Sequence, residues 1–179
     1  MTQVSQVYGQ ALYSLTAEEA VTDLVLKQLT DLQTAFEQEP DFVRLLQSEN
    51  LSKAERCQII DSSFRDRIHP YVMNFLKLLT EKGYIRHFSQ CCGVFRRQYN
   101  EANGILPVTA VSAVQLSQSQ QQKLTDKLAA VTGKKVDLLC KVDPQCLGGL
   151  RLDFDGKRLD GTIRHRLDDL RSILKNTVL

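Results

Sequence analysis

Long apolar runs, paired cysteines and clustered histidines are all missing from this sequence of 179 residues. No stretch approaches the ~20 consecutive apolar residues that a membrane-spanning helix needs, so we expect no transmembrane segment. The first residues show no basic and apolar signal pattern, which predicts a cytosolic chain. With 42% hydrophobic and 25% charged residues, the composition is typical of a soluble globular protein.

The five cysteines are an odd number and never occur with C-x-x-C spacing. This pattern favours a reducing compartment over a disulfide framework, and it argues against a zinc site. Cys91 and Cys92 are adjacent, so on a helix they point about 100° apart and make a poor pair of ligands. We interpret the cysteines as small buried side chains, and they are Cys57, Cys91, Cys92, Cys140 and Cys146.

Catalytic motifs are also missing. His69, His87 and His165 have no partner at the spacing of a metal or acid/base site. The segment 132–135, Thr-Gly-Lys-Lys, resembles the end of a phosphate-binding loop but lacks the earlier glycine and the final Ser or Thr. We therefore expect a protein that is not an enzyme and that has no catalytic, metal or cofactor site.

The small net charge of +2 hides a strong asymmetry along the chain. Residues 1–64 contain four Lys or Arg against ten Asp or Glu, whereas residues 65–179 contain nineteen against eleven. The basic second part could follow a phosphate backbone, but acids interrupt it and no aromatic pair offers a stacking platform. A solvated face or a protein partner is the favoured interpretation.

The first 104 residues show apolar side chains at helical spacing, divided by turn signals. Pro40 and Pro70 suit the starts of helices, and Ser52 with Glu55 forms the S-x-x-E pattern of a capping box. Gly83 and Gly104 suit helix ends. The pattern predicts six short amphipathic helices packed as a bundle.

After Gly104 the apolar period changes from 3.6 to 2, which indicates a second domain. Alternating strands are predicted at 105–113, 136–142, 150–154 and 157–159, and Pro107 should be tolerated only at an edge or a strand start. Two helices complete the order β-α-β-β-β-α. One runs from the capping box at Ser117 to Gly133 with Leu124, Leu128 and Val131 inward, and the other follows Thr162 or Asp160 with a stripe of Ile163, Leu167, Leu170 and Leu174.

The sequence therefore predicts an α+β protein, with a six-helix bundle over 1–104 followed by a small α/β domain over 105–179. The pair Gly148-Gly149 interrupts a predicted strand, where glycine usually marks a bulge or a close backbone approach. An anion site at this pair is the less favoured interpretation.

Several segments of the sequence, in the same order along the chain, resemble segments of one protein family. Residues 142–150, Val-Asp-Pro-Gln-Cys-Leu-Gly-Gly-Leu, and residues 159–163, Leu-Asp-Gly-Thr-Ile, resemble the carboxyl-terminal signature of the delta subunit of F-type ATP synthase. This subunit is the bacterial counterpart of the mitochondrial oligomycin-sensitivity-conferring protein. Further landmarks lie at 8–13, 74–79, 111–117 and 132–136, so the resemblance covers essentially the whole chain.

At some positions the residue differs from the one that is usual in this family. Gly9 stands where alanine is usual, and it should weaken the first helix by about 0.5–1 kcal/mol relative to Ala. Gln145 and Cys146 also differ, and the order of Asp155-Gly156 is reversed.

The resemblance implies a non-catalytic stator subunit. Such a subunit joins the catalytic head to the peripheral stalk, so that rotary torque drives ATP synthesis. It implies that the amino-terminal domain binds an amino-terminal helix of the alpha subunit between its first and fifth helices, with the beta subunit as a further candidate contact. The matching positions are Tyr8, Ala11, Leu12, Leu15, Asn74, Phe75, Leu76 and Leu79.

The second domain is expected, from the same resemblance, to bind the b-type subunits of the stalk. The positions concerned are Leu150, Arg164, Leu167, Leu170, Arg171 and Leu174. No nucleic-acid partner is implied, and membrane association would arise only through the complex, at the cytoplasmic face of the bacterial cell membrane. The alternative is an RNA-binding or regulatory adaptor that uses the basic second domain.

Overall fold

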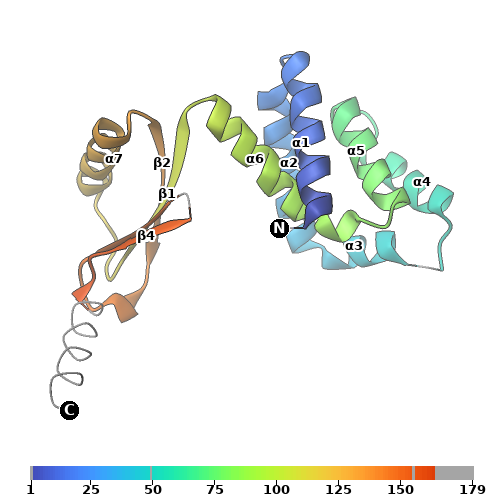
Figure 1. Ribbon diagram of the computed structural model, residues 1–179. Coiled ribbons are helices and arrows are strands. Elements are labelled where there is room, and N and C mark those ends of the chain that lie inside the picture. The colour runs from blue at the N-terminus through green and yellow to red at the C-terminus, as the bar shows by residue number, and fades with distance from the viewer. Residues whose placement is uncertain (1, 49, 155, 164–179) are drawn as a thin grey trace, which may run out of the picture. The chain divides into compact units, whose positions relative to one another are not determined.

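The chain contains helices and one four-stranded sheet, which confirms the mixed α+β class (Figure 1). The computed structural model describes residues 2–48, 50–154 and 156–163. The chain divides into two compact units, Met1–Tyr99 and Asn100–Leu179. Among the described residues, no helix combines the length and the apolar character that crossing a membrane requires.

The first unit is helical. Its elements are α1 (Gln3–Glu18), α2 (Thr22–Gln38), α3 (Pro40–Gln47), α4 (Lys53–Phe64), α5 (Pro70–Glu81), the 3-10 helix η1 (Ile85–His87) and α6 (Phe88–Ala102). Pro40 and Pro70 occupy the first positions of α3 and α5, as predicted. The capping box before α4 is also confirmed, since Ser52 Oγ accepts from Glu55 N and the Glu55 carboxylate accepts from Ser52 N.

The core of the first unit draws on every one of its helices. Its most deeply buried apolar side chains are Val25, Leu29, Leu46, Ile60, Val72, Leu76, Leu79, Ile85 and Phe95. Cys91 and Cys92 are buried with them, and Cys146 is buried in the second unit, as the sequence predicted, whereas Cys57 and Cys140 are only half-buried. Burial raises the pKa of the Cys91 thiol to about 11 and that of Cys92 to about 12, so both stay protonated and unreactive at neutral pH.

Gly9 has a packing role in addition to its expected effect on helix propensity. A methyl group at this position of α1 would lie 2.7 Å from the carbonyl oxygen of Cys91 and 2.7 Å from Cβ of Val94. Glycine is therefore what allows α1 to pack closely on α6, and this contact outweighs the small gain in helix propensity that alanine would bring.

The second unit contains the sheet and one described α-helix. Strand β1 (Ile105–Ser112) pairs in parallel with β2 (Lys135–Val142) and antiparallel with β3 (Leu150–Phe154), which pairs antiparallel with β4 (Lys157–Asp160). Helix α7 (Gln118–Thr132) connects β1 to β2 and contacts β2. The 3-10 helix η2 (Pro144–Cys146) leads into β3. The strand order β2-β1-β3-β4 makes β1 a central strand.

The strand pairing around Pro107 explains why a proline is tolerated in β1, and the sequence alone does not reveal this pairing. It lies in the central strand β1, but β3 pairs only with Thr109–Ser112, so at Pro107 only β2 is alongside. The missing N–H can therefore face the unpaired side.

Val131 corrects the prediction for α7. Leu124 and Leu128 are half-buried, but Val131 on the last turn is 85% exposed and does not face inward. The helix predicted after Thr162 lies outside the described residues.

Candidate functional site

An apolar stripe on the exposed face of α1 is the first candidate for a binding surface. Val7 is 60% exposed and Leu15 is 41% exposed, and the exposed Ala11 lies between them at intervals of four residues. This spacing places the three side chains on one face of the helix. Together with the exposed positions Asn74 and Leu78 of α5, we name this the α1/α5 surface.

The contacts of the two helices place the stripe on the side of α1 that faces α5. Tyr8 of α1 makes an edge-on ring contact with Tyr84, three residues beyond the end of α5, at a centroid distance of 5.9 Å. Tyr13, on the other flank of α1, contacts Phe95 of α6 instead. The stripe therefore lies on the same side of α1 as Tyr8. Helices α1 and α5 are in contact.

Two exposed positions of α5 flank the side chain that reaches α4. Lys77 Nζ forms an ion pair of 2.6 Å with Asp61 Oδ1 of α4, and Lys77 lies three residues beyond Asn74 and directly before Leu78. Asn74 and the 40% exposed Leu78 lie four residues apart, and Figure 1 shows α5 between α1 and α4. Two neighbouring helices thus offer adjacent exposed positions with little charge, which suits the apolar side of another helix.

The structure separates the eight positions that the sequence assigned to the alpha-subunit helix. Four are core residues of the first unit, with Leu12 at 5% exposure, Phe75 at 6%, and Leu76 and Leu79 at 0%. Ala11, Leu15 and Asn74 are exposed, and Tyr8 is half-buried. Val7 and Leu78 are also exposed on these helices but were not among the eight positions, although the i, i+4 pattern of Val7, Ala11 and Leu15 is a signal that could have included Val7.

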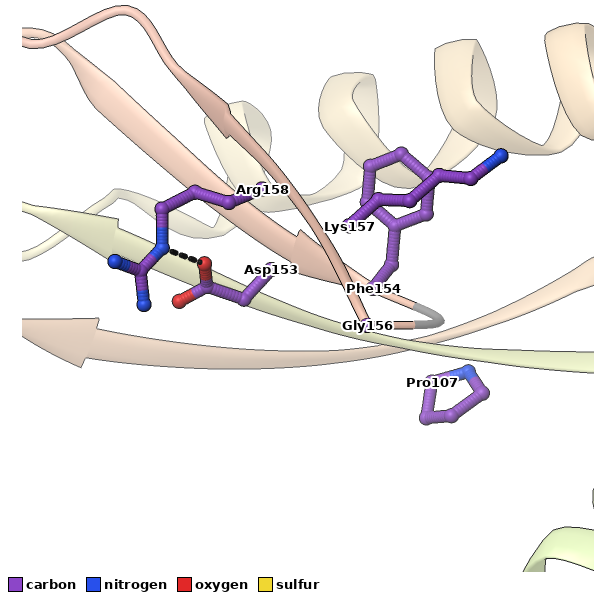
Figure 2. A pocket seen from close by; sticks show the side chains of 6 residues that line it. All are labelled: Pro107, Asp153, Phe154, Gly156, Lys157 and Arg158. Atoms are coloured by element: carbon purple, nitrogen blue, oxygen red, sulfur yellow. Dashed lines mark hydrogen bonds and ion pairs between the residues drawn. The ribbon is translucent and has the colours of Figure 1, made fainter.

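The second candidate surface is the β3–β4 hairpin. Arg158 Nε lies 2.8 Å from Asp153 Oδ1 (Figure 2). Arg151 Nε lies 3.3 Å from Asp153 Oδ2, so one carboxylate joins two guanidinium groups. The hydrogen bond from Arg158 lowers the pKa of Asp153 and raises that of Arg158. A hollow of about 560 Å³ beside this pair is lined by Pro107, Asp153, Phe154, Gly156, Lys157 and Arg158. Its lining combines these charged groups with the apolar side chains of Pro107 and Phe154.

The Gly148-Gly149 pair makes the close backbone approach that the sequence predicted. A methyl group on Gly149 would lie 2.5 Å from the carbonyl oxygen of Gly161 and 2.9 Å from Cα of Thr162. Ile163 N donates to Gly148 O at 3.0 Å, and Gly161 N donates to Leu150 O at 3.0 Å. The two parts of the signature, residues 142–150 and 159–163, are therefore joined by backbone hydrogen bonds and by close packing.

Asp160 completes this arrangement. Its Oδ1 accepts from the backbone N and from the hydroxyl of the buried Thr162, at 3.0 and 2.7 Å. Of the positions assigned to the stalk, Leu150 is half-buried on β3. The other five, Arg164, Leu167, Leu170, Arg171 and Leu174, lie outside the described residues.

The described part of the chain offers no arrangement of side chains suited to catalysis. His69 Nδ1 accepts from Tyr71 N at the start of α5, and His87 Nε2 accepts from Arg86 Nε. Within residues 2–48, 50–154 and 156–163, no three His, Cys, Asp or Glu side chains gather as metal ligands would. His69 and His87 thus have local structural roles, and His165 lies outside the described residues.

Comparison with known proteins finds one family that the chain matches over almost its whole length. The family model described as "ATP synthase delta (OSCP) subunit" matches residues 4–174. The chain is 30% identical over 173 residues to the ATP synthase subunit delta of Desulfitobacterium hafniense (strain DSM 10664 / DCB-2), with 97% of each chain covered. It is 31% identical over 170 residues to that of Chlorobium chlorochromatii (strain CaD3), with 95% of each chain covered.

A solved structure shares the fold at lower sequence identity. A chain in the cryo-EM structure of the Toxoplasma gondii mitochondrial ATP synthase hexamer superposes with a TM-score of 0.78 and 18% identity. The match covers 97% of the present chain and 98% of the other. The fold of both units together is therefore one already seen in a rotary ATP synthase.

Proposed function

Since the chain belongs to the ATP synthase delta (OSCP) subunit family, we propose that its α1/α5 surface binds an amphipathic helix at the amino terminus of the alpha subunit. The chain is a stator component of the F-type ATP synthase and a structural subunit without catalysis of its own. Nothing in the comparisons supports an RNA-binding adaptor. What remains is to assign the partners to particular surfaces.

The exposed apolar stripe on α1 is the single observation that carries this proposal. Val7, Ala11 and Leu15 are apolar, but they lie on the exposed face of α1 and not in the core. A helix laid along them buries a few apolar anchors, which supplies affinity without reactive groups. We propose Val7, Ala11, Leu15, Asn74 and Leu78 as the contact positions, with Tyr8 at the edge.

The other four positions that the sequence assigned to the alpha-subunit helix lie beneath the α1/α5 surface. Leu12, Phe75, Leu76 and Leu79 are buried in the core. They hold α1 and α5 in place, so their replacement would weaken binding through loss of folding. The first unit acts in this proposal as a six-helix bundle over 1–104 that holds the catalytic head through the alpha subunit, with the beta subunit as a further contact.

The second unit would bind the b-type stalk subunits as a small α/β domain over 105–179. The hairpin with Arg151 and Arg158, the half-buried Leu150 and the segment from residue 164 onward are the proposed contacts. Two sites on one chain make the connection stronger than either site alone, because the second contact becomes intramolecular. The chain would thereby resist rotor torque at the cytoplasmic face of the bacterial cell membrane, peripherally and through the complex alone.

Calorimetric titration tests both assignments. The full chain is titrated first with a peptide of the alpha-subunit amino terminus and then with the soluble part of b. We expect two independent binding events, each with a negative heat-capacity change from apolar burial. Absence of heat in the first titration would contradict the α1/α5 assignment, and absence in the second would contradict the stalk assignment.

A further inference from the structure

Strand β2 forms a long and regular edge of the sheet. All eight of its residues, from Lys135 to Val142, pair with β1 in an unbroken parallel register. Among the strands that the structure describes, β1 is its one neighbour, because β2 comes first in the order β2-β1-β3-β4. An edge of this kind presents unpaired N–H and C=O groups to which a further strand can bind. The outer side of β2 is therefore a candidate interaction surface.

Alternate residues of β2 direct their backbone groups to this outer side. Lys135 N donates to Gly104 O at 2.9 Å. Just beyond the other end of the strand, Asp143 N donates to Ser112 O at 2.9 Å. The odd-numbered residues thus direct their backbone groups toward β1, and the even-numbered residues direct theirs outward, because successive residues of a strand alternate. The residues with outward N–H and C=O groups are Val136, Leu138, Cys140 and Val142.

The odd-numbered side chains of this segment carry a charge pattern that is complementary to its own reverse. The pattern is centred on Leu139, which is 56% exposed. A lysine and then an aspartate precede this leucine at intervals of two residues, and a lysine and then an aspartate follow it. They are Lys135, Asp137, Lys141 and Asp143. In an antiparallel copy of the segment, each lysine therefore meets an aspartate.

The neighbouring strand offers these charges no counterpart. Lys135, Asp137 and Lys141 are exposed. The residues of β1 that lie opposite them are all uncharged, and they are Ile105, Pro107 and Val111. Among the ion pairs of the described residues, none involves a residue of β2. The charge pattern is therefore available to a further strand at the outer edge.

We propose that two copies of the chain join through their β2 strands, antiparallel and centred on Leu139 of each copy. In this register Val136 lies opposite Val142 of the second copy, and Leu138 lies opposite Cys140. These are the residues with outward backbone groups, so each such pair exchanges two hydrogen bonds. The two four-stranded sheets then continue as one. The α1/α5 surface takes no part in this contact, so the inference does not depend on the proposed function.

The charges favour this register over the neighbouring ones. Lys135 faces Asp143 of the second copy in a pair without hydrogen bonds, where opposite side chains lie closest. Asp137 faces Lys141 in the same kind of pair. A centre one residue earlier would place Lys135 opposite Lys141, and a centre one residue later would place two aspartates opposite each other. Because directly opposed like charges destabilise strand pairing, the sequence of β2 specifies one register.

Sedimentation equilibrium of the full chain measures this association. A single strand edge buries less area than a permanent interface, so we expect a dimer that dissociates on dilution. Lys141→Asp places like charges opposite each other twice in the symmetric dimer, and it should weaken the dimer about tenfold or more. Asp137→Lys should do the same. The combined variant again has opposite charges in every pair, so its dissociation constant should return to within about threefold of the unmodified value.

Lys123→Asp is the matched control for these charge changes. It alters the net charge as Lys141→Asp does, but at an exposed position of α7, and it should leave the dimer unchanged. Recovery in the combined variant would exclude loss of folding as the cause of the single effects. A chain that stays monomeric at all concentrations, single changes without effect, or a combined variant as weak as the single ones would each overturn the proposal.

Cysteine cross-linking gives an independent measurement of the register. The Cα atoms of Leu139 in the two copies should be ~4.5 Å apart, a separation that a disulfide spans. Oxidation of Leu139→Cys with diamide should therefore give covalent dimers well above the level of the unmodified chain. Val142→Cys is the control, since Val142 is similarly exposed at 54% but its two copies would lie ~20 Å apart along the paired strands. Equal cross-linking of both variants, or none of Leu139→Cys, would overturn the proposed pairing.

Discussion

Gly9 of α1 and Val94 of α6 lie so close that a Cβ built on Gly9 would be 2.7 Å from Cβ of Val94. The carbonyl oxygen of Cys91 is at the same distance. At this distance α1 cannot slide along α6. The position of the exposed stripe of α1 relative to α6 is therefore fixed as well. The small size of Gly9 is thus a packing feature of this chain.

Gly9→Ala should destabilise the protein by about 1–3 kcal/mol, because the backbone of α6 must move to admit the methyl group. Gly93→Ala is the matched control, since Gly93 lies in α6 with nothing within 4 Å of the new methyl group. That control should stabilise the chain by about 0.5–1 kcal/mol through helix propensity. Urea unfolding measures both changes, and stabilisation by Gly9→Ala would contradict the close-packing account.

Gly149→Ala should cost about 2–4 kcal/mol in the second unit. Its φ of 85° is unfavourable for alanine, and the new methyl group would overlap the carbonyl oxygen of Gly161. Gly156→Ala shares the positive φ of 71° but has open space around it, so it should cost only ~1 kcal/mol. Thermal unfolding compares the two, and equal costs would show that crowding at Gly161 has no effect.

Arg158→Gln should raise the pKa of Asp153 toward its ordinary value, since the hydrogen bond from Arg158 is the main cause of its lowering. A carboxyl group with a lowered pKa stabilises the fold above its unfolded-state pKa, and this stabilisation disappears as the pH falls through the folded-state value. In the variant this stabilisation should therefore be smaller, and its loss should be complete at a higher pH. Carboxyl NMR titration measures the shift, with Lys157→Gln as the control that leaves Asp153 unchanged.

The sequence predicted much of the local structure because its signals are local. Pro40, Pro70 and the capping box of Ser52 and Glu55 identify helix starts whatever surrounds them. The change of period after Gly104 likewise depends only on neighbouring residues. Such features need no knowledge of how the helices pack.

The contact surface was only half predictable. Leu12 and Leu15 lie on adjacent parts of one apolar stripe, yet Leu12 is 5% exposed and Leu15 is 41% exposed. Periodicity gives both the same status, because burial depends on where α5 and α6 lie. The role of Gly9 was hidden for the same reason, since the crowding comes from residues more than eighty positions away.

The central claim is that the exposed stripe of α1 binds the alpha-subunit helix. Ala11 lies in the middle of this stripe, whereas Ala17 is also exposed on α1 but lies away from it. Arginine at either position can extend into water and leave the helical content of the free chain unchanged, which circular dichroism checks.

Calorimetric titration of the alpha-subunit amino-terminal peptide into Ala11→Arg and Ala17→Arg is the most direct test. We predict that Ala11→Arg weakens binding at least about 30-fold, as expected for a central contact worth 2 kcal/mol or more, while Ala17→Arg binds like the unmodified chain. Unchanged affinity of Ala11→Arg, or equal losses in both variants, would contradict the account.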